Sequence, residues 1–584
     1  MFNEPGDNPV AAPSESLDAR VDPLGEAPVA SPVDPRAEAL VYALRRDLLV
    51  AEYSEERLLS LVSESARRAC LQGYTAAAAA ELNARIEAAD SVDPADSVAP
   101  AIANPADPAG NANLSVPADP AATIALLFFA GEPVSEARLA AVFSQLGVAG
   151  LKTLGLVTET GSGYFRAALS LTPLQMRGKT PGETVNTWFI SDLDDHLRQK
   201  AARQDHVMGI GGATRALLKQ LPRGSFGSTS ADNSPSQPEP FTSALDLGTG
   251  CGVIAVQLAQ FSECVVATDT SDRALKLARL NLRLNAISSV TLLQGSLFQP
   301  VAGQRFDLIA SNPPFVITPG GSDYEYRSSG FSGDGLVQQL LTGVPEHLRP
   351  GGEFVSLINW EVHWGSDRFA RPASWVERLA GVHTWLIARE VMAPLDYAMM
   401  WARDGGSAQH SSEFDTRVTA ALRDFQERKT VAVVMGSVRI IAAETKHSHR
   451  AATITGQLAA GDVGDELSRI HRLAVQLENL RLQQFLGHHF ITQGSPQEHR
   501  RYRPGQESPN KLWLSVASPF AQQFEVDPLV AAAVGASDGD LTLGQIAAAL
   551  AELFSVPAAE CYAALHTEFL ELVWAGVLVT EIQQ

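Results

Sequence analysis

One short stretch restricts the fold of this chain more than any other. Residues 244–256 read ALDLGTGCGVIAV, an apolar run that leads into three glycines and then directly into an apolar helical pattern. Gly248, Gly250 and Gly252 let the backbone turn sharply and approach a ligand closely. The stretch therefore predicts a strand, a ligand-binding loop and a helix of a parallel α/β sheet. Its spacing is G-x-G-x-G rather than the G-x-G-x-x-G of dinucleotide sites, so the loop alone leaves a nicotinamide cofactor or a merely structural turn open.

The next expected strand, residues 264–269, ends in Asp269. The carboxylate follows Gly248 by about 20 residues, the distance at which an acid reaches the ribose hydroxyls of a nucleotide-type ligand. A helical pattern starts at Ser271, as a strand–helix–strand unit requires. We therefore predict that Asp269 binds a ribose. The alternative, an acid favoured only by a helix N-terminus, fits Asp272 better than Asp269.

A fourth predicted strand, residues 306–311, runs into Asn312-Pro313-Pro314-Phe315. The Asn312 side-chain oxygen and the Pro313 carbonyl can hold both N–H groups of a planar nitrogen whose lone pair is delocalised, and orient it for reaction. The prolines fix their own φ and keep Asn312 extended, so these acceptors are preorganised. Phe315 offers a flat face for stacking. A rigid turn after a buried strand would explain the prolines but not the residues on either side of them.

The runs DLGTGCGVIAV (246–256) and SNPPFVITPG (311–320), with Asp269, resemble the HemK-type glutamine N5-methyltransferases and their relatives that act on exocyclic amines of adenine or guanine. The resemblance covers about residues 200–365. It implies a class I methyltransferase fold, a doubly wound Rossmann-like α/β sheet, and S-adenosylmethionine (SAM) as cofactor. Where many such enzymes have an acid for the adenine amino group, this chain has Ser296. The residues implied for SAM are Asp246, Gly248, Gly250, Gly252, Asp269 and Ser296, and those implied for the acceptor are Asn312, Pro313, Pro314 and Phe315.

The sequence leaves the methyl acceptor open. Bacterial glutamine methyltransferases of this type usually carry N-P-P-Y, whereas this chain has N-P-P-F. The N-P-P-F motif and the segment 205–212 are similar to the rRNA guanine-N2 enzymes. The tail 316–319 is instead similar to the release-factor-modifying branch. We expect methylation of a planar nitrogen on a macromolecule of translation, leaning to a base amine of RNA (rRNA or tRNA). The alternative is a glutamine of a release-factor-like protein. An alternative of another class is a non-catalytic nucleic-acid-binding protein on a methyltransferase scaffold.

Composition divides the rest of the chain. One core stops growing near roughly 250–300 residues, so 584 residues predict several domains. Residues 1–36 and 89–120 are rich in Pro, Ala and Asp, which predicts a disordered tail and a disordered linker. The ordered parts expected are a helical region at 37–88, a winged-helix-like domain at 121–175, the SAM-dependent methyltransferase domain at 176–445 with a loop insertion at 222–242, and a C-terminal helical or winged-helix-like domain at 446–584.

Charge and residue types narrow the partners. The formal net charge of −21 opposes extended contact with a phosphate backbone, and the dense basic run His499-Arg500-Arg501-Tyr502-Arg503 is the candidate RNA contact. No apolar run approaches the roughly 18 residues of a membrane helix, and the N-terminus lacks a signal pattern, so we expect a cytoplasmic protein without a membrane partner. The scattered cysteines and isolated histidine pairs predict neither disulfides nor a metal site. The oligomeric state is left open.

Overall fold

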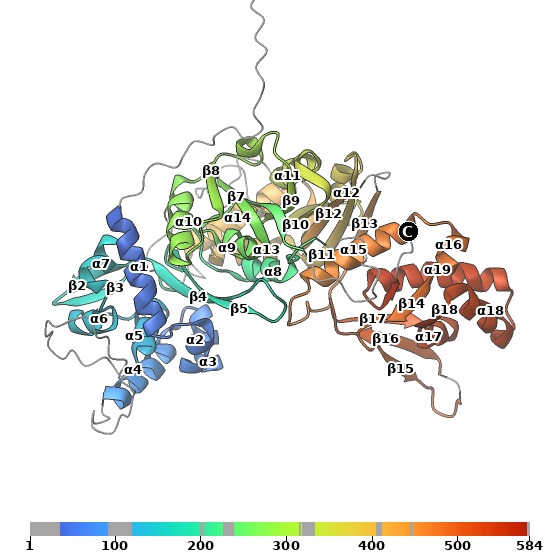
Figure 1. Ribbon diagram of the computed structural model, residues 1–584, viewed down its shortest axis with the longest axis horizontal. Coiled ribbons are helices and arrows are strands. Elements are labelled where there is room, and N and C mark those ends of the chain that lie inside the picture. The colour runs from blue at the N-terminus through green and yellow to red at the C-terminus, as the bar shows by residue number, and fades with distance from the viewer. Residues whose placement is uncertain are drawn as a thin grey trace, which may run out of the picture.

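The computed structural model describes residues 35–580 except 91–118, 195, 199–202, 204, 226–238, 315–316, 318–332, 405–410, 444–447 and 508. Figure 1 shows three groups of elements, with the N-terminal helices on one side, a large sheet in the middle and the C-terminal elements on the other side. None of the described helices is long and apolar enough to cross a membrane. Within the same residues, no group of three His, Cys, Asp or Glu side chains could hold a metal ion.

Eight strands form the central sheet in the order β13-β11-β12-β10-β9-β6-β7-β8. β8, β7, β6, β9 and β10 are parallel, and β12 runs antiparallel between β10 and β11. The chain moves from β6 outward to β7 and β8, and then returns to the other side of β6 with β9 and β10. A parallel sheet opens a ligand crevice at such a reversal, outside the carboxyl ends of the strands. The strands are β6 (Phe241–Leu247), β7 (Ser262–Asp269), β8 (Val290–Gln294), β9 (Phe306–Ser311), β10 (Leu348–His363), β11 (Val382–Met392), β12 (Thr430–Ala442) and β13 (Ser448–Thr453).

Helices cover both faces of this sheet, because alternate residues of its buried strands face opposite cores. In β9, Leu308 and Ala310 belong to one apolar cluster with residues of α9 and α10, whereas Ile309 belongs to a second cluster with residues of α11 and α12. The doubly wound α/β fold is therefore confirmed. The helices of this part are α8 (Gly212–Gln220), α9 (Val253–Phe261), α10 (Asp272–Leu284), α11 (Gly335–His347), α12 (Ala370–Val376), α13 (Pro394–Asp404) and α14 (Ser412–Glu427).

The N-terminal elements pack as one body across the undescribed residues 91–118. The carboxylate of Asp47 accepts hydrogen bonds from the backbone N–H groups of Gln145 (3.0 Å) and Leu146 (2.9 Å), which joins the first helix to the later ones. Ser135 caps α6, which ends at Val142, and a further helix begins at Gly147. The elements are α1 (Pro35–Val50), α2 (Glu55–Leu61), α3 (Glu64–Leu71), α4 (Ala76–Asp90), α5 (Pro120–Phe128), β1 (Val134–Ser135), α6 (Glu136–Val142), α7 (Gly147–Thr153), β2 (Val157–Gly161) and β3 (Tyr164–Ala167).

A hairpin of β4 (Ser170–Arg177) and β5 (Thr184–Ser191) joins the N-terminal elements to the sheet. Amide side chains fix the position of this hairpin. Each amide has an N–H₂ donor group and a carbonyl acceptor, so it can make the two backbone hydrogen bonds that a neighbouring strand would otherwise make. Each amide pairs with the backbone N–H and C=O of one hairpin residue: Gln257 with Arg177, Asn281 with Ile190 and Asn285 with Trp188.

The C-terminal elements are attached to the sheet rather than separate from it. β13 pairs with β11 beyond residue 445, where the sequence analysis ended the methyltransferase domain. Buried Glu353 of β10 pairs with Arg439 of β12 and accepts a hydrogen bond from Ser468 of α15. The elements are α15 (Gly464–Glu478), α16 (Leu482–Leu486), β14 (His489–Thr492), β15 (Gln497–Arg501), β16 (Lys511–Val516), β17 (Gln522–Val526), α17 (Pro528–Gly535), β18 (Asp538–Thr542), α18 (Leu543–Phe554), α19 (Ala558–Trp574) and β19 (Leu578–Thr580). The winged-helix-like character of the flanking regions stays a prediction.

Candidate active site

A cavity of about 770 Å³ lies where the strand order reverses, at the carboxyl ends of β6 and β9. This volume falls in the range of small-molecule and cofactor sites. Of the residues that the sequence analysis selected, the cavity brings together Gly248, Gly250, Asp269, Ser296, Asn312, Pro313 and Pro314.

The three loop glycines all have positive φ, +79° at Gly248, +54° at Gly250 and +90° at Gly252. Such φ values strain any residue with a Cβ. At Gly248 and Gly250 an added Cβ would meet nothing within 4 Å, so both backbones border open space of the cavity. At Gly252 a Cβ would lie 3.2 Å from the Cβ of Ala278, and Gly252 is not among the residues that line the cavity. In the structure Gly252 thus allows α9 and α10 to approach each other.

Asp246 lies behind the glycine loop instead of facing the cavity. Its side chain is fully buried, and one carboxylate oxygen accepts a hydrogen bond of 2.6 Å from the Thr249 hydroxyl. The other oxygen has no hydrogen-bond partner among the described residues. Burial raises the pKa of Asp246 to about 7, although the Thr249 hydrogen bond opposes this shift. Asp246 therefore supports the loop through Thr249, a residue that lines the cavity.

Asp269 ends β7 at the opposite side of the loop. Its carboxylate accepts hydrogen bonds from the backbone N–H groups of Gly250 and Ser271, both of 2.9 Å. Burial raises the pKa of Asp269, and these two hydrogen bonds oppose the shift. The carboxylate borders the cavity and keeps lone pairs for a further donor such as a hydroxyl.

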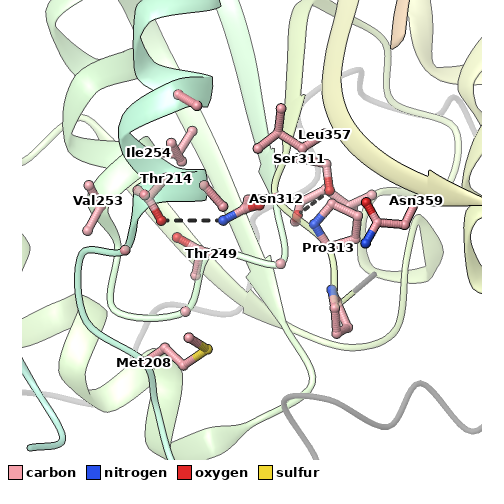
Figure 2. Close-up of a pocket in the computed structure, with 18 of the residues that line it drawn as sticks. Met208, Thr214, Thr249, Val253, Ile254, Ser311, Asn312, Pro313, Leu357 and Asn359 are labelled. Carbon is pink, nitrogen blue, oxygen red and sulfur yellow. Dashed lines mark hydrogen bonds between the residues drawn. The ribbon is translucent and has the colours of Figure 1, made fainter. Parts of the chain in front are cut away.

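Asn312 follows β9 directly and lies beside Thr249 of the glycine loop, as Figure 2 shows, because β6 and β9 are neighbouring parallel strands. Its side-chain nitrogen donates a hydrogen bond of 3.3 Å to the Thr214 hydroxyl at the start of α8. Its side-chain oxygen is buried and has no hydrogen-bond partner among the described residues. This arrangement fixes the amide plane and leaves one strong acceptor for a ligand. Phe315, the predicted stacking residue, lies outside the described residues.

Tyr397 of α13 holds the chain beyond the two prolines. Its hydroxyl accepts hydrogen bonds from the backbone N–H of Ile317 (3.0 Å) and from the Asn359 side chain (3.2 Å). The ring is fully buried, and burial raises the pKa of Tyr397 to about 12. Asn359 also lines the cavity. The sequence analysis selected neither residue, since no local motif marks them.

The segment before α8 forms another wall of the cavity. The Asp192 carboxylate at the end of the hairpin accepts hydrogen bonds from the Val207 backbone N–H (2.8 Å) and the Arg273 side chain (3.0 Å). The Cys251 thiol of the glycine loop donates to the Met208 carbonyl at 3.5 Å. The hairpin, this wall and the glycine loop are therefore mechanically connected.

Two family models match the chain. Residues 231–366, which include the glycine loop, Asp269 and the N-P-P motif, match the methyltransferase small domain. This part of the chain is a class I methyltransferase domain. The match confirms the methyltransferase interpretation of these motifs. Residues 50–168 match a domain of unknown function (DUF7059), which spans N-terminal elements on both sides of the undescribed residues 91–118.

The methyltransferase domain is also similar to curated proteins. A release factor glutamine methyltransferase from Xylella fastidiosa (strain Temecula1 / ATCC 700964) is 39% identical over 127 residues, 20% of this chain and 46% of that protein. One from Geobacter sulfurreducens is 41% identical over 120 residues, 18% and 42% of the two chains. A ribosomal protein uL3 glutamine methyltransferase from Xanthomonas campestris pv. campestris is 38% identical over 123 residues, 19% and 40% of the two chains. The chain thus spans less than half the length of these relatives.

Proposed function

We propose that the chain transfers a methyl group from SAM to the side-chain amide nitrogen of a glutamine in a protein. The observation that carries this proposal is the Asn312 side-chain oxygen, which is buried without a partner among the described residues beside the cavity that the glycine loop borders. A buried acceptor of this kind costs free energy until a donor reaches it. An amide N–H₂ group is such a donor.

The cavity suits SAM. Gly248 and Gly250 leave open space where side chains would project, so their backbones can approach the cofactor. Asp269 would accept hydrogen bonds from the ribose hydroxyls, and Ser296 would lie at the adenine. Asp246 and Gly252 would act indirectly, by holding the loop and its helix in position. When bound, SAM supplies an electrophilic methyl group.

Asn312 and Pro313 would orient the amide. The amide nitrogen is a poor nucleophile, because its lone pair is delocalised into the carbonyl group. The Asn312 oxygen and the Pro313 carbonyl would accept its two N–H bonds and so direct the nitrogen lone pair, while Thr214 prevents Asn312 from turning away. Formation of the N–C bond would be matched by cleavage of the sulfur–methyl bond, which leaves S-adenosylhomocysteine, and one of the two amide protons would pass to solvent.

A protein acceptor is favoured over RNA. The three relatives above are named for glutamines of release factors or of a ribosomal protein. Among the described residues that line the cavity, Arg389 is the one arginine and there is no lysine, whereas a nucleic-acid groove is ordinarily rich in both. In the basic run, Arg500 pairs with Glu498, whose negative charge offsets that of the arginine. The lean to an RNA base finds no support here.

The test is to incubate the purified chain with methyl-labelled SAM and, separately, with release factors, ribosomal proteins, tRNA and rRNA from the same cells. We expect label in protein, mapped by tandem mass spectrometry to one glutamine side chain, and an initial rate of labelling at least roughly a hundredfold lower with Asn312→Ala. Label in RNA alone would contradict the proposal.

A further inference from the structure

The cavity extends well beyond Asn312. It crosses the sheet over β10, β12 and β11 and ends against the C-terminal elements. We call this far end the distal compartment and define it by five lining residues: Gln220, Arg389, Ser437, Leu458 and Phe520. Leu458 and Phe520 belong to the part of the chain that follows the sheet.

The wall of the distal compartment is firmly built. Leu458 and Phe520 form an antiparallel bridge, flanked by a backbone hydrogen bond of 3.0 Å from Ala459 to Pro519. The Arg389 side chain donates hydrogen bonds of 2.6 Å to the carbonyls of Ile454 and Gly456, and its guanidinium carbon lies 4.5 Å from the centre of the Phe520 ring. These contacts hold the guanidinium in one position.

Polar atoms of this compartment lack partners. The Ser437 hydroxyl and the Gln220 side-chain oxygen have no hydrogen-bond partner among the described residues, although these residues are only 1% and 5% exposed. Arg389 pairs with no carboxylate in the described part of the chain, and its hydrogen bonds to the two carbonyls leave other N–H groups of the guanidinium for a ligand. Native proteins rarely bury polar groups in this way, so the compartment is suited to a polar ligand.

We propose that the distal compartment binds the polypeptide backbone of the substrate on one side of the methylated residue, a few residues away from it, which rests on the proposed function. A peptide unit offers one carbonyl acceptor, for Arg389, and one N–H donor, for Gln220 or Ser437. A simple anion would satisfy Arg389 but could not donate to the Gln220 oxygen. Among the described lining residues there is no second arginine and no lysine for a phosphate backbone.

The sheet sets the length of peptide that reaches the compartment. Asn312 follows β9, and Arg389 lies on β11, three positions away in the order β9-β10-β12-β11. At about 4.8 Å between neighbouring strands, this separation is roughly 14 Å. An extended chain spans about 3.3 Å per residue, so the compartment holds backbone about four residues from the glutamine.

The test uses acetylated, amidated glycine–alanine peptides with a single glutamine, lengthened one residue at a time on either side. We expect kcat/KM to rise with length on one side, up to about four residues, and then to level off. The quantity compared among variants is the ratio of kcat/KM for the long peptide to kcat/KM for the shortest peptide. Ser437→Ala should lower this ratio by about three- to ten-fold, the effect of one hydrogen bond. Gln220→Met should act similarly.

A matched control comes from β7. Ser262 also has a hydroxyl without a partner among the described residues, but it lies outside the cavity, so Ser262→Ala should leave the ratio unchanged. Arg389→Met should lower the ratio at least tenfold. Because Arg389 also holds the Ile454–Gly456 backbone, the melting temperature of the Arg389→Met variant must be checked. If this variant fails to fold, Ser437→Ala and Gln220→Met carry the test.

Equal ratios in Ser437→Ala, Gln220→Met and Ser262→Ala, or no dependence on length on either side, would overturn the distal compartment. A separate measurement distinguishes this from failure of the proposed function. Long peptides with methionine in place of glutamine should still bind in calorimetry, and Ser437→Ala should weaken them three- to ten-fold. If they bind in this way while no glutamine is methylated, the function is wrong and the compartment stands.

Discussion

Replacing Asp246 by asparagine should remove a pH-dependent loss of stability. The pKa of this buried carboxyl is raised from 3.8 to about 7, so the folded chain binds the proton more tightly than the unfolded chain does. The resulting stabilisation is complete below about pH 4 and is lost as the pH rises to about 7. At about 1.4 kcal/mol per pH unit the total is about 4 kcal/mol, of which about 2 kcal/mol is lost between pH 5 and pH 7. Asparagine keeps the acceptor for Thr249 and has no proton to lose.

Hydrogen exchange of the buried amides of β6 and β9 measures this effect in the full chain, because these amides exchange when the sheet opens. The free energy of opening, asparagine variant minus wild type, should increase by about 3 kcal/mol from pH 5 to pH 8. Asp272→Asn, which changes an exposed carboxylate solvated in both states, should give a constant difference. If the difference in opening free energy is also independent of pH for Asp246→Asn, burial does not raise the pKa of Asp246 as described.

Three other substitutions test separate contacts. Asn281→Ala removes hydrogen bonds to the hairpin and to the Cys251 carbonyl of the glycine loop. It should lower the free energy of unfolding by about 3 kcal/mol and weaken SAM binding. Asp269→Ala should weaken SAM binding by about 1.5–3 kcal/mol in calorimetry, and unchanged affinity would mean that the ribose is held elsewhere. Arg439→Met removes the closer of the two arginines that pair with buried Glu353 and should destabilise the chain by about 3–5 kcal/mol, with partial recovery in the double variant Arg439→Met/Glu353→Gln.

The parts of the fold that the sequence predicts are those encoded in short runs. Residues 244–256 contain a buried strand, its glycine turn and the first residues of its helix in uninterrupted order, so their local structure follows from neighbouring residues alone. The same holds for β9 and the prolines that end it. By contrast, α7 begins Gly-Val-Ala-Gly, and glycine is a poor helix former, so this helix depends on tertiary packing. β13 reads Ser-His-Arg-Ala-Ala-Thr, with no alternation of large apolar residues, which is why the sheet was expected to end before it.

The candidate site is predicted only in part, for a related reason. Gly248, Asp269 and Asn312 end parallel strands or follow them, so they meet at one edge of the sheet. Periodicity does not distinguish a residue that faces a ligand from one that lies behind the loop, and Asp246 and Gly252 are of the second kind. Asn359, Ser437 and Arg389 come together because β12 runs between β10 and β11, a long-range pairing that no local pattern reports.

A single-turnover measurement of Asn312→Ala by rapid quench, together with its SAM affinity, tests the role of the N-P-P motif most directly. The substitution removes one of the two acceptors that orient the nitrogen and leaves the glycine loop and Asp269 intact. We expect methyl transfer to glutamine to slow by at least roughly a hundredfold while SAM binds almost as in the wild type. Methyl transfer within a few-fold of the wild-type rate would contradict the proposed catalytic role of Asn312.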